Sequence, residues 1–197
     1  MKILGGRYLD ENELRDLGLE RVGSNVLVHE RAILVDLDRI SLGSNVRIDA
    51  FCVLSASAGS LAIGDHVHIA SHADIYAGGG VEIGDFCGLS QGGKIYSTND
   101  DYSGKSLTGP TIPKQYTNVH RAPVKLGRHV VVGSGSVVLP GVEIGEGSTV
   151  GALSLVSRNL DPWGVYGGVP ARRLKDRRKD LLERERDLLK DSLDPGH

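Results

Sequence analysis

Hydrophobic residues along this chain recur every six positions, except in one segment. Several of the sets open with an aliphatic residue directly before glycine, as in "VGSNV", "LGSNV" and "IGDHV". The recurring positions form six sets of three: Val22, Val28 and Leu34; Leu42, Ile48 and Leu54; Ile63, Ile69 and Ile75; Ile83, Leu89 and Ile95; Leu126, Val132 and Val138; Ile144, Val150 and Val156. A helix would space such residues by three and four, and a long strand would space them by two.

A second recurring position lies four residues after the first and is mostly small or β-branched. It comprises Val26, Ala32, Val46, Cys52, Val67, Ala73, Cys87, Gly93, Val130, Ser136, Ser148 and Ser154. A period of six with a large and a small inward residue indicates a short strand followed by a corner. Three such units make one coil, and each coil buries its aliphatic residues only by stacking on its neighbours. The pattern therefore predicts an all-β domain built as a parallel β-helix.

Two terminal segments and one internal segment break the period. Residues 8–20 are typical of a short amphipathic helix with Leu9, Leu14 and Leu17 on its apolar side, so residues 1–21 are expected to cap the first coil. Residues 22–169 are expected to form the β-helix, with an extruded loop over about residues 97–123. From Pro170 the chain is rich in charge, and residues 170–197 are predicted to be a C-terminal helix and tail.

Composition narrows the class of protein. A net charge of −2 gives no electrostatic reason to expect nucleic acid or a membrane surface as a partner. The N-terminus lacks the apolar core of a signal peptide, and no stretch approaches the roughly 20 apolar residues of a membrane-spanning helix. Cys52 and Cys87 both occupy the small inward position, where a thiol packs as a small hydrophobe, and they do not make a disulfide framework. We expect a cytoplasmic protein.

With this repeat the chain resembles the hexapeptide-repeat acyltransferases over about residues 22–175. The resemblance implies a left-handed parallel β-helix and a homotrimer with active sites between neighbouring prisms. The last coils, "GSGSVVLPGVEIGEGSTVGALSLVS", are similar to the acetyl-CoA-binding end of sugar O-acetyltransferases of the galactoside and maltose type. Acetyl-CoA as co-substrate and a sugar as acceptor are therefore implied.

The same resemblance assigns residues to the cofactor. Small side chains have a physical reason here, because a long thin cofactor can lie on the backbone only where side chains do not block it. Residues matched to the pantetheine arm are Gly133, Ser134, Ala152, Ser157 and Arg158. Arg172 and Lys175, in "GGVPARRLK", are matched to the phosphates, which guanidinium and ammonium groups both bind well. Backbone N–H groups near Ser134 or Ser136 are candidates to stabilise an oxyanion.

The irregular segment runs from Ile95 to Gly127 and begins "IYSTNDDY". Long loops inside compact domains usually serve function, and in the resembling enzymes this loop covers the neighbouring subunit's site. Galactoside-type enzymes carry a catalytic histidine where the loop begins, which takes the proton of the attacking hydroxyl. This chain has Asp100 at that position, with Asn99 beside it.

Three interpretations of the absent histidine stay open. The acceptor could be an amine, which needs little help from a base; "TNDDY" is similar to the "TND-x-Y" stretch of nucleotide-linked amino-sugar N-acetyltransferases, which implies that Asn99 and Asp100 position the acceptor. Alternatively, Asp100 is a base for a hydroxyl, although a carboxylate with a pKa near 4 is weak at neutral pH. In the third interpretation another histidine is the base: His120 near the loop's return, or His68 or His72 on the preceding coil.

The sequence thus predicts an acetyl-CoA-dependent acetyltransferase acting on a sugar in surface polysaccharide synthesis. A nucleotide-linked amino sugar is favoured over the hydroxyl of a hexose or galactoside. A second class stays open, that of non-acylating hexapeptide-repeat trimers that bind metal or serve as scaffolds. Members resembling γ-carbonic anhydrase need three histidines across an interface, and here His68 and His72 are the two plausible contributors, so we predict no metal site.

Overall fold

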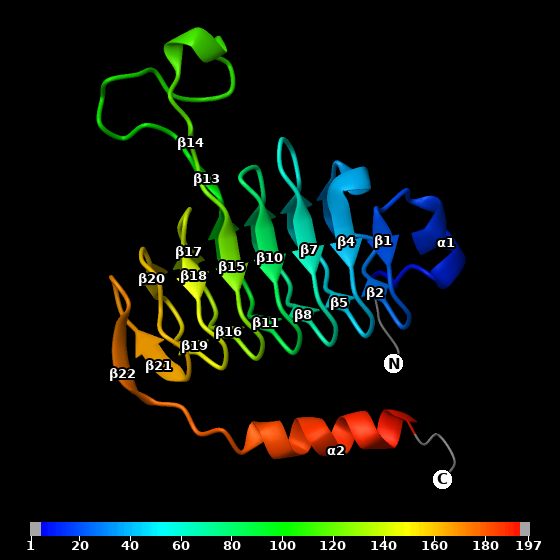
Figure 1. Cartoon of the computed structure of the whole chain (residues 1–197). Coiled ribbons are helices and arrows are strands. Elements are labelled where there is room, and N and C mark those ends of the chain that lie inside the picture. Colours follow the sequence, from blue (N-terminus) through cyan, green and yellow to red (C-terminus); the bar gives the residue numbers. More distant parts are fainter. Residues whose placement is uncertain (1–4, 194–197) are drawn as a thin grey trace.

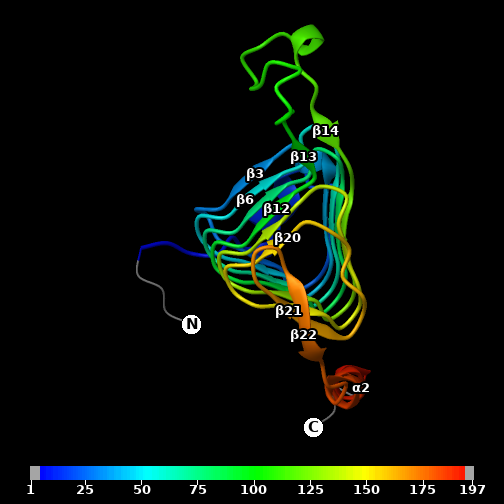
Figure 2. The same ribbon diagram turned by 90° about the vertical axis from the view of Figure 1, so that its left-hand side faces the viewer.

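The computed structural model describes residues 5–193, which form a three-sided prism with a loop at one corner and a helix at another (Figures 1 and 2). Short strands from successive coils pair in parallel along each side. The predicted left-handed parallel β-helix is confirmed. We name the three sides sheet I, sheet II and sheet III in the order in which the chain meets them, and each corner by the two sheets that it joins.

Sheets I and III have six strands each, and sheet II has eight. Sheet I comprises β1 (Arg21–Val22), β4 (Ile40–Leu42), β7 (Leu61–Ile63), β10 (Val81–Ile83), β15 (Val124–Leu126) and β18 (Glu143–Ile144). Sheet II comprises β2 (Leu27–Val28), β5 (Arg47–Ile48), β8 (His68–Ile69), β11 (Gly88–Leu89), β16 (Val131–Val132), β19 (Thr149–Val150), β21 (Gly164–Gly167) and β22 (Arg172–Asp176). Sheet III comprises β3 (Ile33–Val35), β6 (Val53–Ser55), β9 (Asp74–Tyr76), β12 (Lys94–Tyr96), β17 (Val137–Val138) and β20 (Leu155–Val156).

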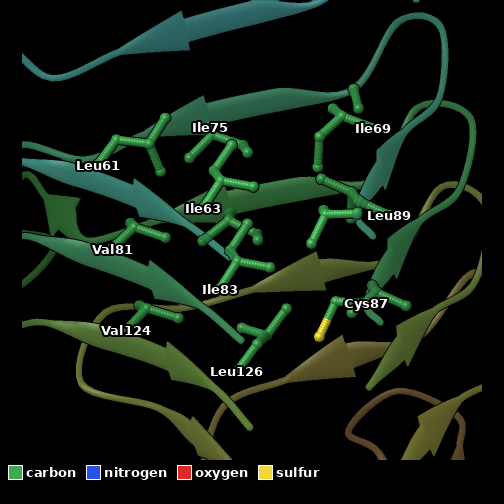
Figure 3. Close-up of a cluster of buried hydrophobic side chains, with 14 of the residues drawn as sticks. Leu61, Ile63, Ile69, Ile75, Val81, Ile83, Cys87, Leu89, Val124 and Leu126 are labelled. Carbon is green, nitrogen blue, oxygen red and sulfur yellow. The ribbon is translucent and has the colours of Figure 1, made fainter. Parts of the chain in front are cut away.

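The predicted aliphatic positions point into the prism and stack as three ladders, one for each sheet (Figure 3). Ile63, Ile69 and Ile75 of one coil come from sheets I, II and III, and each is at most 3% exposed. Val22 and Leu34, in the first coil, are only partly buried. A coil therefore gains its buried apolar surface from the coils above and below it, which is why the repeat must be long to be stable.

The corners explain the aliphatic-glycine pairs. At corner I–II the glycine that follows each sheet I strand lies against the next coil: a Cβ on Gly64 would stand 2.9 Å from the backbone N of Asp85. Two residues later the chain turns through the left-handed region, with φ of 58° at Asn45, 57° at His66 and 58° at Phe86. Asparagine tolerates this conformation better than most residues, and the aromatic residues there stack from coil to coil.

The small inward positions fill the space behind the corners. Burial raises the pKa of the Cys52 thiol to about 11 and that of the Cys87 thiol to about 12. Both thiols therefore stay protonated and unreactive at neutral pH. Ser136 and Ser154 in the last coils are buried too, and their hydroxyls donate to the carbonyl of Gly151 at 2.9 and 2.7 Å.

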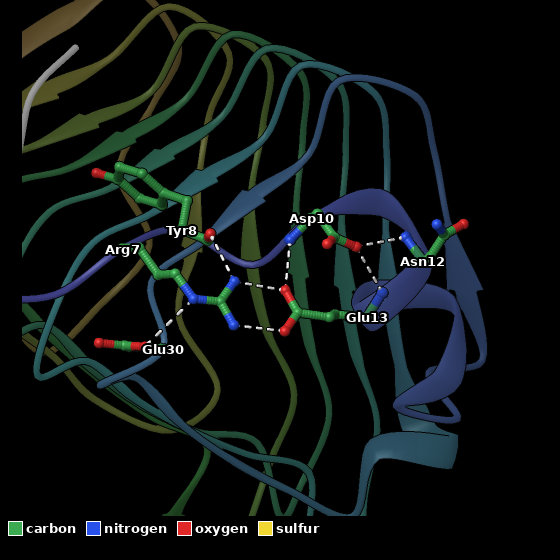
Figure 4. Close-up of polar contacts among 6 residues, drawn as sticks. All are labelled: Arg7, Tyr8, Asp10, Asn12, Glu13 and Glu30. Carbon is green, nitrogen blue, oxygen red and sulfur yellow. Dashed lines mark hydrogen bonds and ion pairs between the residues drawn. The ribbon is translucent and has the colours of Figure 1, made fainter.

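The N-terminal helix is shorter than the sequence predicts: α1 spans Glu11–Asp16 rather than residues 8–20. Asp10 caps it, accepting the N–H groups of Asn12 and Glu13, and Glu13 accepts the Asp10 N–H in return (Figure 4). Arg7 binds the Glu13 carboxylate through two hydrogen bonds. These bonds, led by the one from Arg7, lower the pKa of Glu13 to about 2. The helix starts late because Tyr8 bridges to His29, and it ends early at Gly18, whose φ is 76°.

The C-terminal segment corrects the prediction of a helix starting at Pro170. Residues Arg172–Asp176 instead form β22, antiparallel to β21, and α2 spans only Leu181–Leu193. Helix α2 runs back along corner I–II (Figure 1), where Glu185 pairs with Arg128 and with Nε2 of His129 at 2.8 Å. Residues 1–4 and 194–197, at the ends of the two predicted terminal segments, lie outside the described residues.

The irregular segment leaves the prism between β12 and β15 at corner III–I and projects well beyond it (Figure 2). Its neck is a two-stranded antiparallel ribbon of β13 (Thr98–Asn99) and β14 (His120–Arg121). Buried Ser97 holds the neck to the prism, accepting from the Gly79 N–H at 2.8 Å and donating to the Tyr76 carbonyl at 2.9 Å. Two short 3₁₀ turns lie at Leu37–Arg39 and, within the loop, at Lys114–Tyr116.

Candidate active site

Corner II–III carries three of the predicted cofactor residues, Gly133, Ser134 and Ala152. The N–H groups of Gly135 and Leu153 donate to the carbonyls of the preceding coil at 3.0 and 2.9 Å, which holds the corners in register. Small side chains leave the backbone of these coils accessible. The Ser136 N–H donates to the Gly133 carbonyl at 3.2 Å, so this N–H is already used within its corner and is a poor candidate to bind an oxyanion.

The other predicted cofactor residues lie elsewhere in the same chain. Ser157 and Arg158 follow β20 and are exposed at corner III–I, on the far side of sheet III. Arg172 and Lys175 are exposed on β22, beyond the last coil on sheet II. One copy of the chain therefore does not gather the whole predicted set on one corner.

Neighbouring basic residues have structural partners. Arg173 donates to the Tyr166 hydroxyl at 2.9 Å and to Asp176 at 2.8 Å. Arg177 donates to the carbonyls of His129 and Gly147, and burial lowers its pKa. Arg172 and Lys175 are both exposed, and neither forms an ion pair among the described residues.

The loop neck gathers three of the predicted catalytic residues. Asn99 is the register partner of His120 across the ribbon, and Asp100 follows Asn99 directly. Asp100, Lys114 and Arg121 line a hollow of about 580 Å³ within the loop. The next carboxylate, that of Asp101, accepts the Ser103 N–H at 2.8 Å and shapes the turn beyond the neck.

The structure separates His68 and His72 from this neck. His68 lies on the outer face of sheet II, with Nε2 2.9 Å from Asp49, a carboxylate that also binds Tyr8 at 2.6 Å and Arg47 at 2.7 Å. Burial alone would raise the pKa of Asp49, but the hydrogen bonds from Tyr8, His68 and Arg47 outweigh it and lower the pKa. His72 lies at corner II–III.

Other surfaces of the described residues give weaker candidates. An open hollow of about 600 Å³ on the outer face of sheet I is lined by Arg21, Glu82 and Lys125, on a different face from both clusters above. Within residues 5–193 no three His, Cys, Asp or Glu side chains gather as metal ligands would. None of the described helices has the length and apolar character needed to span a bilayer.

Comparisons with known proteins point to acyl transfer. The family model "Bacterial transferase hexapeptide (six repeats)" matches residues 123–158. An Escherichia coli protein, dTDP-4-amino-4,6-dideoxy-D-glucose acyltransferase, is 44% identical over 178 residues, which cover 90% of this chain and 93% of the relative.

Solved structures extend the match. AntD, an N-acyltransferase from Bacillus cereus in complex with dTDP and 3-hydroxybutyryl-CoA, is 43% identical, with a TM-score of 0.90 over 94% of this chain and 97% of that chain. An AntD variant in complex with dTDP-4-amino-4,6-dideoxyglucose and coenzyme A has the same identity and TM-score, over 93% of this chain and 98% of that chain.

The AntD structures include variants of a serine and of an aspartate ten positions after it. In this chain that spacing occurs at Ser55–Asp65 and at Ser90–Asp100. Asp65 serves a corner by accepting the Ser44 N–H at 2.7 Å. Ser90 opens corner II–III one coil before Gly133, and Asp100 stands at the loop neck. The hexapeptide pattern alone does not single out Ser90, but arranging the sequence coil by coil would have placed it in line with the predicted cofactor residues.

Proposed function

Because this chain belongs to the hexapeptide-repeat acyltransferases, we propose that it transfers an acyl group from coenzyme A to the amino group of a dTDP-linked 4-amino-4,6-dideoxy sugar. The observation that carries this proposal is the match over nine-tenths or more of both chains to enzymes named for acyl transfer, one of them solved with that sugar nucleotide and coenzyme A. The amino-sugar interpretation of "TNDDY" agrees with these relatives. Synthesis of a surface polysaccharide is the setting that we propose for the product.

We infer that the active enzyme is a homotrimer in which sheet III faces the other copies. Its outer face is apolar at both ends, with Ile33, Val35 and Val53 in the first coils and Val137 and Leu155 in the last. Ile33 is 57% exposed in a single copy, and large exposed apolar patches usually mark interfaces. A ring closed around sheet III sets corner II–III of one copy against corner III–I of the next.

This arrangement explains why the candidate site residues of one copy lie at two different corners. Ser90 and Asp100 stand at opposite ends of β12, so the width of a sheet separates them within one chain. In the proposed trimer Ser90 faces Asp100 of the partner subunit. Gly133, Ser134 and Ala152 line the pantetheine arm from one side, while Ser157 and Arg158 of the partner subunit approach it from the other. Arg172 and Lys175 bind the phosphates at the last coil.

An amine acceptor also explains the aspartate at the loop neck. In the reaction a C–N bond forms, the C–S bond of the thioester breaks, and the amine loses one proton as the thiol leaves. A neutral amine attacks without prior removal of a proton, so no strong base is needed. Asp100 accepts a hydrogen bond from the amine and stabilises the positive charge that develops on its nitrogen. Asn99 and His120, paired beside it, shape the acceptor side of the pocket.

The protein's interior is compatible with a reducing compartment. Cys52 and Cys87 are both free thiols. Because disulfides are rare in the cytosol, and coenzyme A thioesters and nucleotide-linked sugars are made there, we propose a cytoplasmic location.

Thiol release from acetyl-CoA tests the function directly, with dTDP-4-amino-4,6-dideoxyglucose and the matching 4-hydroxy sugar nucleotide as acceptors. We expect turnover with the amine alone. Asp100→Asn should lower kcat about a hundredfold, the low end of what a positioned group that stabilises transition-state charge contributes, while the affinity for coenzyme A is retained. Asp101→Asn, one residue further along the same loop, is the matched control and should keep wild-type turnover. Turnover with the hydroxyl sugar, or none with the amine, would contradict the proposal.

A further inference from the structure

We propose that the ring of His72, backed by Phe51 and Arg31, is the wall that limits the length of the acyl group accepted by this enzyme. The inference rests on the proposed function, because it assigns a role at the same donor site. It concerns the acyl group rather than the acceptor, and nothing in the relatives' names assigns it.

A stack of side chains along corner II–III stops at His72. The His72 ring lies on the Phe51 ring with centroids 5.1 Å apart and an angle of 20° between the planes. The guanidinium carbon of Arg31 lies 5.9 Å from the centroid of Phe51. Phe51 thus contacts both Arg31 and His72 while remaining 47% exposed, whereas the His72 ring stacks on Phe51 alone.

The next two coils have no side chain at this position. Gly92 and Gly135 follow His72, and Leu153 comes after them. All four share the left-handed backbone, with φ between 56° and 67°, so they occupy equivalent places in successive coils. With strands about 4.8 Å apart, the gap from His72 to Leu153 spans about 14 Å. The other ring face of His72 thus looks into this gap.

Only part of the gap is open. A Cβ on Gly135 would stand 2.8 Å from Cδ2 of Leu153, so the Leu153 side chain leans over Gly135. A Cβ on Gly92 would meet nothing nearer than the Gly135 N at 4.0 Å. The open space therefore lies over Gly92, between the ring of His72 and Leu153, and beside Ser90.

The corresponding line at corner I–II has no such gap. Asn45, His66, Phe86 and His129 occupy it in successive coils, His66 on Phe86 at 4.7 Å and Phe86 on His129 at 5.1 Å. The glycine that follows them, Gly147, is covered by the Trp163 ring, which lies 2.5 Å from the place of a Cβ, so the open gap is found at corner II–III and not along corner I–II. Corner II–III is the corner that carries the predicted pantetheine residues.

The direction of the donor places its acyl group in this gap. Phosphates held at Arg172 and Lys175, and an arm along Ala152 and Ser134, bring the thiol end to the coil of Ser90. An acyl chain continues in the same direction, toward the coil of His72. A short acyl group fits over Gly92, and a longer one meets the flat ring, which Phe51 keeps from swinging away.

Two opposite substitutions test the wall. His72→Asn removes the ring and keeps a residue that tolerates the left-handed backbone, so the ratio of kcat/KM for hexanoyl-CoA to that for acetyl-CoA should rise about tenfold. Gly92→Asn fills the gap and should lower that ratio about tenfold. His72→Phe keeps a ring of similar size, in a conformation that Phe51 and Phe86 already adopt, and should keep the wild-type ratio.

His66→Asn is the matched control, because it removes a histidine from the same backbone conformation and the same kind of stack on the other corner. Its ratio should equal that of the wild type. Binding of hexanoyl-CoA and of free coenzyme A, measured by calorimetry without acceptor, gives a second readout: His72→Asn should strengthen the first and leave the second unchanged.

An unchanged ratio and unchanged hexanoyl-CoA binding in a folded His72→Asn protein would overturn the inference, as would a ratio that changes equally in His66→Asn. If His72→Asn does not fold, Gly92→Asn decides the matter in the same way. Failure of the proposed function would look different, because the wild type would then release no thiol with the amino sugar, while the calorimetric comparison of acyl chains could still be made.

Discussion

The outer faces of sheets I and III differ, although the two sheets bury the same kind of residue in the same register. Sheet I presents a mainly charged and polar surface to solvent, with Ala62 as its one apolar residue: Arg21, Ser41, Ala62, Glu82, Lys125 and Glu143. The equivalent positions of sheet III are Ile33, Val53, Asp74, Lys94, Val137 and Leu155. Each set alternates with a buried aliphatic ladder of its own sheet.

This difference separates two tasks of the sequence. The inward positions specify the coil, and any aliphatic residue of suitable size serves on any of the three sheets. The outward positions do not have to fill the interior, so their residues are suited to whatever surrounds each face. Sheet I meets solvent, and in the proposed trimer sheet III meets other copies of the chain. The fold is therefore shared with many proteins, whereas the site depends on the outward residues and on the corners.

The largest effect is expected from a charge on the apolar end of sheet III. Ile33→Asp should dissociate the trimer and lower acyl transfer at least a hundredfold, because a carboxylate buried at an interface without a partner is costly. Arg21→Asp is the matched control, at the edge strand of sheet I in the same coil, and should leave both properties intact. Light scattering and thiol release measure them. A fully trimeric, active Ile33→Asp protein would show that sheet III is not the interface.

A smaller effect, equal on all sheets, is expected from the interior. Ile63→Ala, Ile69→Ala and Ile75→Ala remove the same group from sheets I, II and III of one coil, each at most 3% exposed. Each should lower the free energy of unfolding by about 2–5 kcal/mol, the usual cost of such a cavity. Denaturant unfolding gives the values. Costs that differ strongly between the three sheets would mean that the interior does not treat them alike.

Particular residues show how much of this could be predicted from the sequence. The ladder residue Ile75 can be predicted from the sequence, because the coil fixes its six-residue spacing and no other subunit is involved. Helix α2 was harder to place, since the run of charged residues after Pro170 hides the strand Arg172–Asp176, whose position depends on pairing with β21. Ser90 and Asp100 could not be linked from one chain, because they meet only between copies in the proposed trimer. The residues that flank His72 in the sequence do not reveal whether the next coil places a side chain against its ring. The open ring face therefore becomes visible only when the corners are stacked in the structure.

The smallest effect that we predict concerns the ion pair on each face. Lys94 pairs with Asp74 on sheet III, and Lys125 pairs with Glu82 at 3.1 Å on sheet I. The hydrogen bond to Asp74 is the main cause of a raised pKa at Lys94. The charged form is therefore favoured in the folded protein, and the stability it contributes is fully present below the ordinary lysine pKa of 10.5 and is lost as the pH rises through the higher folded value.

Lys94→Met should accordingly lower stability by about 1 kcal/mol at pH 8, and the difference from the wild type should shrink only above about pH 10.5. Lys125→Met is the control on the exposed face, where both partners are more than half exposed and an isolated pair contributes little. Melting curves from pH 8 to pH 11 compare the three proteins, and the shared titration of other groups cancels in the differences. Equal curves for the two variants would mean that the ion pair on sheet III is as well solvated as the ion pair on sheet I. That result would contradict the proposal that other copies of the chain cover sheet III.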